Sequence, residues 1–163
     1  GINYAKKVFK NSKSIAKVRK EVEFQKTASE LGVAPKIIDF SIQSPPSITM
    51  ECLDKTVIDL IKEQDGKLED EQQKKILKIY KTLDENKIVH NDANPLNLMT
   101  KDGEWYLIDY GFAKKHGKTH KKNQNLCVGL RFLLKSTKGL LTRKILTTQP
   151  TILLDAIEKQ SYD

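Results

Sequence analysis

The sequence predicts an α+β fold in which a small, mainly β N-terminal part precedes a mostly helical C-terminal part. Short apolar runs separated by turn residues dominate the first 53 residues, which indicates strands. Apolar residues at helical spacing dominate the remainder, where the turn Lys101-Asp102-Gly103 marks a hairpin. With 163 residues and 38% hydrophobic content, the chain is long enough for one domain or for two small lobes that share a cleft.

The N-terminal part is expected to contain one long helix and three strands. The helix is predicted over residues 14–31 because apolar side chains recur there every three or four residues, and Gly32 and Pro35 then end it. Ser44-Pro45-Pro46 is expected to form the turn between the last two strands. The strands are predicted over residues 4–10, 36–42 and 47–53.

Helical periodicity dominates after residue 53. Thr56 and Asp59 are spaced to cap a short helix, and the turn Asp65-Gly66-Lys67 separates it from a longer helix over residues 69–86. The apolar face of the longer helix is expected to support the loop that follows it. Later elements are predicted as a strand over 105–108, helices over 123–135 and 138–147, and a helix that starts at Pro150.

The segment from Ile88 to Ala113 carries the polar residues that indicate chemistry. His90, Asp92 and Asn97 lie on a short loop after an apolar pair, and Asp109 follows the strand over 105–108. Phosphoryl transfer needs a carboxylate that accepts the proton of the attacking hydroxyl, and hard oxygen ligands that hold magnesium. Asp92 is therefore the candidate base, while Asn97 and Asp109 are the candidate metal ligands.

These residues resemble the motifs of the protein-kinase-like superfamily, whose catalytic loop reads His-Arg-Asp, then four residues, then Asn, and whose metal turn reads Asp-Phe-Gly. Here Asn91 replaces the arginine and Tyr110 replaces the phenylalanine. In the family that arginine commonly receives an activation-loop phosphate, so this mode of switching is not expected. The resemblance implies one two-lobed kinase-like domain over residues 1–163, with 1–53 as a reduced N-terminal lobe and hinge and 54–163 as the helical C-terminal lobe.

The resemblance also assigns nucleotide-binding roles near the N-terminus. Lys7 ends an Ala-x-Lys segment similar to that of the family, so it would hold the α and β phosphates of ATP. Glu21, on the helix that follows, would pair with Lys7. Glu23 lies about 200° further around the helix, so the two glutamates cannot both face the nucleotide. An exposed Glu21 that makes only surface pairs is the alternative.

The strand over residues 47–53 is similar to the fifth strand and hinge of the family. Met50 would then lie at the back of the adenine pocket, and the Glu51 carbonyl and Leu53 amide would hydrogen-bond the adenine. The adenine contacts would come from backbone groups, so side-chain identity does not test this assignment. A plain core strand would show the same side-chain pattern, and that alternative stays open.

Three features depart from the family pattern. Only Gly1 is available ahead of Lys7 for a glycine-rich loop, so either the chain is truncated or the enzyme is a reduced form. No Ala-Pro-Glu sequence follows Gly111, which predicts a smaller surface for docking peptides. Asn94 stands where serine/threonine protein kinases commonly have lysine, a residue that choline, aminoglycoside and lipopolysaccharide kinases also lack.

Positive charge is concentrated between Lys114 and Lys122, and the whole chain carries a net charge of +8. A basic rim near the phosphate site would attract an acidic protein, a phospholipid headgroup or nucleic acid, although a solvated surface loop explains the same run. No aromatic residues alternate with these lysines, so nucleic acid is not an expected partner. His116, His120 and Cys127 lack a fourth ligand at zinc spacing.

No apolar run approaches the ~18 residues of a membrane span, and the N-terminus lacks a signal-peptide pattern. The protein is therefore expected to be soluble and cytoplasmic, in a host cell if it comes from a virus or a bacterial effector. Cys52 and Cys127 are expected to be reduced thiols.

The expected function is that of a minimal, atypical serine/threonine protein kinase, of the kind found in viruses and bacterial effectors. It would transfer the γ-phosphate of ATP to a hydroxyl, with ATP and Mg²⁺ as cofactors and an acidic protein as substrate. A choline-, aminoglycoside- or sugar-like small-molecule kinase is the second hypothesis. A pseudokinase that acts as a binding module is the third, although such a module has no need for Asp92 together with both metal ligands.

Overall fold

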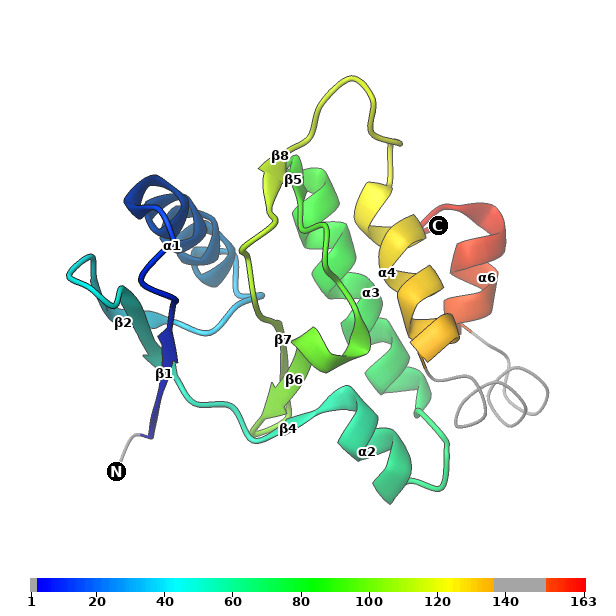
Figure 1. Ribbon diagram of the computed structural model, residues 1–163. Coiled ribbons are helices and arrows are strands. Elements are labelled where there is room, and N and C mark those ends of the chain that lie inside the picture. Colours follow the sequence, from blue (N-terminus) through cyan, green and yellow to red (C-terminus); the bar gives the residue numbers. More distant parts are fainter. Residues whose placement is uncertain (1–2, 137–151) are drawn as a thin grey trace.

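The computed structural model describes residues 3–136 and 152–163, with the backbone alone for 134–136. A small sheet and α1 lie on one side of the molecule, and the other helices lie on the opposite side (Figure 1). This arrangement confirms the predicted α+β fold. The helix predicted over 138–147 and the helix start predicted at Pro150 lie outside the described residues.

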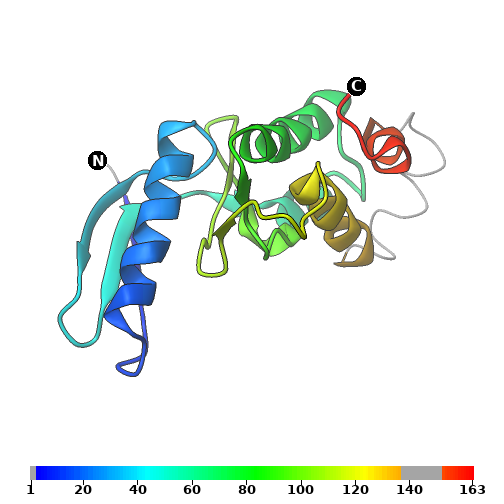
Figure 2. The ribbon, with the colours of Figure 1, turned by 90° about the horizontal axis from the view of Figure 1, so that it is seen from above.

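The N-terminal part is a three-stranded antiparallel sheet with one helix alongside it (Figure 2). The central strand pairs with the first strand from Tyr4↔Glu51 to Val8↔Ser47. Phe9, Val18 and Ile48 belong to the small apolar cluster that joins helix and sheet. The elements are β1 (Tyr4–Val8), α1 (Ile15–Glu30), β2 (Ile37–Ser41) and β3 (Ser47–Glu51), in the sheet order β1-β3-β2.

Local hydrogen bonds fix both ends of α1. The Ser14 hydroxyl accepts from the Lys17 amide at 3.2 Å, which caps the first turn. At the other end Gly32 has φ +83°, and the Val33 amide donates to the Ala28 carbonyl at 3.0 Å, as in a Schellman motif. Val33 then enters the core of the C-terminal part, so this turn sets where α1 meets that core.

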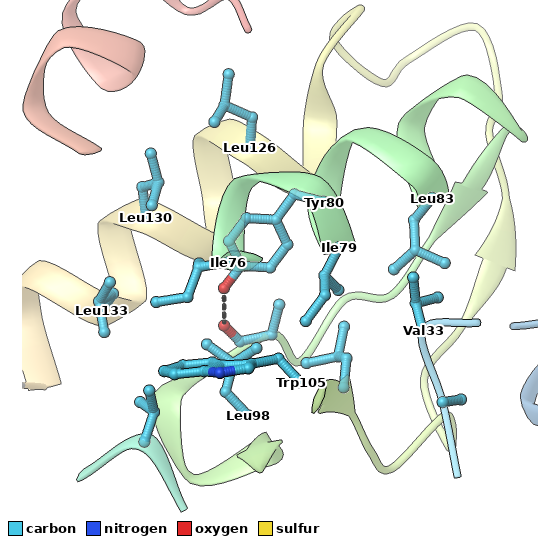
Figure 3. Packing of buried hydrophobic residues seen from close by; sticks show 14 of the residues in the cluster. Val33, Ile76, Ile79, Tyr80, Leu83, Leu98, Trp105, Leu126, Leu130 and Leu133 are labelled. Carbon is cyan, nitrogen blue, oxygen red and sulfur yellow. Dashed lines mark hydrogen bonds between the residues drawn. The ribbon is translucent and has the colours of Figure 1, made fainter. Parts of the chain in front are cut away.

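The C-terminal part is built around α3, whose apolar face is buried. Ile76, Ile79 and Tyr80 face the leucines of α4 and the aromatic ring of Trp105 (Figure 3). As predicted, Thr56 and Asp59 cap α2 with reciprocal hydrogen bonds. Within the described ranges no helix is both long enough and apolar enough to cross a membrane. The helices are α2 (Val57–Glu63), α3 (Asp70–Glu85), α4 (Gln124–Ser136) and α6 (Ile152–Lys159).

Two further sheets position the loops between these helices. Asp102 and Gly103 both have positive φ, +51° and +79°, as a two-residue hairpin turn requires. The two-residue strands β4, β5 and β8 were not predicted, because so short a segment has no periodicity. A plain surface loop was the alternative interpretation of residues 114–122, which we call the basic run. Its first two residues instead form a strand. The elements are β4 (Lys55–Thr56), β6 (Leu98–Lys101) and β7 (Glu104–Leu107) in one sheet, and β5 (Ile88–Val89) with β8 (Lys114–Lys115) in the other.

The crossing of α3 and α4 has no room for a side chain at Gly129. A Cβ atom there would lie 2.5 Å from Tyr80 Cζ, and the Tyr80 ring is fully buried and cannot move aside. We expect Gly129→Ala to lower the free energy of unfolding by about 2 kcal/mol through overpacking. In a thermal melt this corresponds to a decrease in Tm of roughly 4–8 °C.

Gly117→Ala is the matched control, because the nearest atom to its added Cβ would be His120 Nδ1 at 3.8 Å, an ordinary contact. If both variants melt with the wild-type protein, the tight packing between α3 and α4 is not present in solution.

Candidate active site

Lys7 lies between two carboxylates that come from distant parts of the chain. Its Nζ is 2.7 Å from Glu21 Oε2 and 3.1 Å from Asp109 Oδ1. Glu21 is only 2% exposed, whereas Glu23 is exposed on the outer face of α1. The structure therefore brings together the lysine–glutamate pair expected from the helical phase, and it adds Asp109 to the pair.

Electrostatics keep this cluster charged. Burial alone would lower the pKa of Lys7, but Glu21 and Asp109 outweigh burial and raise it. Burial alone would raise the pKa of Asp109, but the Lys7 ammonium holds it below its usual value. Glu21 Oε1 is buried and has no hydrogen-bond partner in the described part of the chain. A Cβ at Gly111 would lie 2.9 Å from this oxygen, so a side chain there would require Glu21 to shift.

His90 joins the catalytic loop to the strand that delivers Asp109. Its Nδ1 accepts from the Asp92 amide at 3.1 Å, and its Nε2 lies 2.9 Å from the Ile108 carbonyl. These partners suit a neutral ring that carries its proton on Nε2. Burial lowers the pKa of His90, which favours the same neutral form. The ring also packs edge-on against Tyr110, with centroids 4.8 Å apart.

Asparagine side chains hold the Asp92 carboxylate in place. Asn97 Nδ2 donates to the Asp92 carbonyl at 2.8 Å and to Oδ2 at 3.3 Å. Asn94, at the position where protein kinases commonly have lysine, donates to Asp92 Oδ1 at 3.1 Å. The Asn97 amide nitrogen is thus committed to Asp92, which leaves its side-chain oxygen as the atom that could bind a cation.

Asn97 and Asp109 lie at neighbouring strand ends. The Ile108 amide donates to the Asn97 carbonyl at 2.8 Å, which extends the β6–β7 pairing up to the residue before Asp109. Amide and carboxylate oxygens are ligands that magnesium accepts, and phosphate oxygens and water commonly complete its shell. No group of three His, Cys, Asp or Glu side chains in the described ranges is arranged to hold a metal. One amide oxygen and one carboxylate make a partial oxygen donor set, which fits a magnesium ion whose other ligands would come from phosphate and water.

The proposed adenine-binding residues lie at the end of β3. Met50 is half-buried, and its sulfur accepts from Gln25 Nε2 at 3.5 Å. The Glu51 side chain forms an ion pair with Lys101 at 3.6 Å, which connects the end of β3 to the end of β6. Leu53 is buried, and its amide makes no hydrogen bond to another backbone group within the described residues. The adenine-binding role of this amide stays a prediction.

Two supporting residues, Asn125 and Asp84, were not predicted from the sequence. Asn125 Oδ1 accepts from the His90 amide at 3.0 Å, and its Nδ2 donates to the Ile88 carbonyl at 2.6 Å and to Asp84 Oδ1 at 2.9 Å. Asp84 is 5% exposed and lies in the last turn of α3, where the helix dipole disfavours a carboxylate. That unfavourable placement was the one sequence signal for a special role.

A small antiparallel sheet with one helix, a helical C-terminal part, and the loops of Asp92 and Asp109 between them define a protein-kinase-like fold. A model of the RIO domain matches residues 3–126, and the chain belongs to this family of atypical protein kinases.

Among solved structures, the chain resembles one in the "Crystal Structure of the yeast RNA Pol II CTD kinase CTDK-1 complex". The TM-score is 0.56 and the identity 20%, over 71% of this chain and 40% of that one. The likeness is one of fold, and the chain spans well under half of that kinase chain. No curated protein matches the chain.

The neutral His90 predicts a dependence of stability on pH. The folded-state pKa of His90 lies below its ordinary value of 6.5, so the unfolded chain binds more protons at mildly acidic pH. The free energy of unfolding should therefore fall as the pH drops below about 6.5, by up to about 1.4 kcal/mol per pH unit. Urea denaturation between pH 7.5 and pH 5.5 measures this slope.

In His90→Gln, whose side-chain amide can still donate to the Ile108 carbonyl, the slope over this range should become shallower. His120→Gln, which also removes one histidine, is the control with which the slope of His90→Gln is compared. Equal slopes in all three proteins would contradict a buried neutral His90.

Proposed function

We propose that the protein is an ATP-dependent serine/threonine protein kinase, which transfers the γ-phosphate of Mg-ATP to a hydroxyl. The observation that supports this best is the double contact of the Lys7 ammonium with Glu21 and Asp109, which come 14 and 102 residues later in the chain. A lysine held in this way is suited to bind phosphate beside a metal-binding carboxylate.

Each residue of the candidate site has a separate part in this proposal. Lys7, held by Glu21, binds the α and β phosphates, while Asn97 and Asp109 hold magnesium. Magnesium, when bound, neutralises charge on the phosphates. Before nucleotide binds, Lys7 neutralises Asp109, so the candidate site does not carry two unpaired carboxylates. Asp92, held by Asn94 and Asn97, orients the acceptor hydroxyl and accepts its proton.

The acceptor in this proposal is a segment of an acidic protein. Lys114 and Lys115 are exposed on β8, and the lysines at 118, 121 and 122 that follow are exposed too. Pairing of β8 with β5 ties the start of this basic run to the strand that leads into the catalytic loop. Negative charge on an acceptor segment would therefore be attracted towards Asp92.

A small-molecule kinase is the second candidate, and one contact favours it. Asn94 replaces the lysine that steadies the transferred phosphate in protein kinases, and its amide is bonded to Asp92 Oδ1. The acceptor tests below distinguish the two functions.

Replacement of Asp92 tests the proposed chemistry. We expect Asp92→Ala to reduce label transfer from γ-labelled ATP, to the protein itself and to casein, by at least about 100-fold, because the acceptor proton loses its base. The rise in Tm with Mg-ATP should persist in this variant, because Lys7, Asn97 and Asp109 remain. Glu21→Gln should lose about tenfold in transfer, since Lys7 loses its buried ionic partner.

Glu23→Gln is the matched control on the outer face of α1 and should transfer label as the wild type does. Undiminished transfer by Asp92→Ala would contradict the assigned base. A wild-type thermal shift without any transfer would identify a pseudokinase, and transfer to choline or an aminoglycoside alone would identify the second candidate.

The acidic acceptor predicts a preference that depends on ionic strength. The wild-type protein should label casein faster than myelin basic protein, and added salt should reduce this preference by screening the charges. The triple variant Lys114→Gln, Lys118→Gln, Lys121→Gln should raise the KM for casein several-fold, with the KM for ATP unchanged.

Lys62→Gln, Lys74→Gln, Lys78→Gln changes the net charge equally on exposed positions of α2 and α3 and is the control. Equal KM values for casein in the two triple variants would show that net charge, and not the basic run, attracts the acceptor.

A further inference from the structure

A tyrosine far from the catalytic loop is bonded to its buried support. The Tyr162 hydroxyl donates to Asp84 Oδ2, across 78 positions in the sequence. Tyr162 follows α6 and lies well beyond residue 126, where the match to the RIO domain ends. The contact therefore joins a segment outside the matched region to a residue at the base of the catalytic loop.

Asp84 depends on its hydrogen-bond donors. Its Oδ1 accepts from the backbone and side-chain nitrogens of Asn125, each at 2.9 Å. Its Oδ2 accepts from Tyr162 and, at 3.3 Å, from the Leu126 amide. A buried carboxylate is tolerated only when such donors replace water. Without the Tyr162 hydroxyl, the long bond to Leu126 would be the one left to Oδ2 among the residues that the structure describes.

Asp84 in turn selects the orientation of the Asn125 amide. Asn125 Nδ2 is shared between Asp84 and the Ile88 carbonyl, which leaves Oδ1 to accept from the His90 amide. The opposite orientation would turn the NH₂ group towards the His90 N–H, so two donors would meet. His90 then receives the Asp92 amide through Nδ1. This path of hydrogen bonds runs from Tyr162 to the candidate base.

Packing of α6 keeps Tyr162 in this position. The Leu153 amide donates to Gln73 Oε1 at 3.2 Å, and the Leu153 side chain is part of the main core. Just before Tyr162, the Gln160 carbonyl accepts from Asn123 Nδ2 at 2.9 Å. Burial and the neighbouring Asp84 carboxylate raise the pKa of the Tyr162 hydroxyl, so it keeps the proton that it donates.

We propose that Tyr162 is a positioning residue for phosphoryl transfer, which holds the catalytic loop in register through Asp84 and Asn125. The proposal rests on the proposed kinase function for its effect on rate. Its structural content, that the Tyr162 hydroxyl orders the backbone from His90 to Asp92, does not require activity. The segment that follows α6 thereby acts on the loop through Asp84 and Asn125.

Tyr162→Phe removes only the hydroxyl and is the first test. We expect kcat for label transfer to fall about tenfold, while the KM for ATP changes less than twofold because Lys7, Glu21 and Asp109 are untouched. Hydrogen exchange of the His90 and Asp92 amides should become at least about tenfold faster. Exchange of the Phe9 amide, which is bonded to Pro46 in the N-terminal part, should not change.

Tyr106→Phe, at a half-buried tyrosine of β7 outside this path, is the matched control and should leave kcat and exchange unchanged. If Tyr162→Phe does not fold, Asn123→Ala loosens the same segment more gently and should shift both readouts in the same direction.

Unchanged exchange at His90 and Asp92 in the folded variant would overturn the proposal. A fall in kcat matched by an equal fall in the folded fraction would also overturn it, because that is general destabilisation. If the wild-type protein transfers no label, the kinase function fails, and the exchange experiment alone still decides whether Tyr162 orders the loop.

Discussion

One ammonium group between two carboxylates is the contact on which the arrangement of the candidate site depends. Lys7 comes from β1, Glu21 from α1 and Asp109 from the turn after β7, so their meeting requires both parts of the molecule to be placed correctly. A backbone hydrogen bond of 2.8 Å from the Leu107 amide to the Val33 carbonyl supplies this placement. It ties the turn that follows α1 to the strand that delivers Asp109.

Behind the charged residues lies a buried polar layer of His90, Asn125 and Asp84. Groups of this kind are costly to bury unless each is hydrogen-bonded, and here each is bonded to the others or to backbone. Such a layer has few alternative arrangements of equal energy. It therefore fixes one geometry for Asp92, while an apolar core would hold the loop without orienting its backbone.

The sequence was most informative where the determinants are local. The helical phase separated Glu21, which was expected to pair with Lys7, from Glu23 on another face of the helix. Cap residues predicted the start of α2, and an Asp-Gly pair predicted the hairpin turn. The motif spacing led to the kinase-like fold, which the RIO match and the structural likeness confirm. The catalytic and metal-binding roles of Asp92, Asn97 and Asp109 stay predictions, although the structure brings the loops that carry them together.

What could not be predicted depends on partners far away in the chain. Strands of two residues exist only because β6 or β5 lies beside them, and no local pattern encodes that pairing. Asn125 and Asp84 are 41 positions apart, and Tyr162 is 78 positions from Asp84. Asn125 and Tyr162 appear in the sequence as ordinary polar residues, and the position of Asp84 at the end of a helix is only a weak signal. Their importance follows from burial, which is a property of the folded chain.

The hairpin between β6 and β7 restricts the insertions and deletions that the gene can tolerate. Its two-residue turn pairs Leu98 with Leu107 and Lys101 with Glu104. The number of residues in the hairpin therefore determines where Asp109 lies relative to Asn97. Inserting or deleting a single codon in β7 would exchange its buried and exposed faces and shift Asp109 by one place along the strand. Length changes tolerated in most surface hairpins would here disrupt the candidate site, so this stretch should accept substitutions far more readily than insertions or deletions.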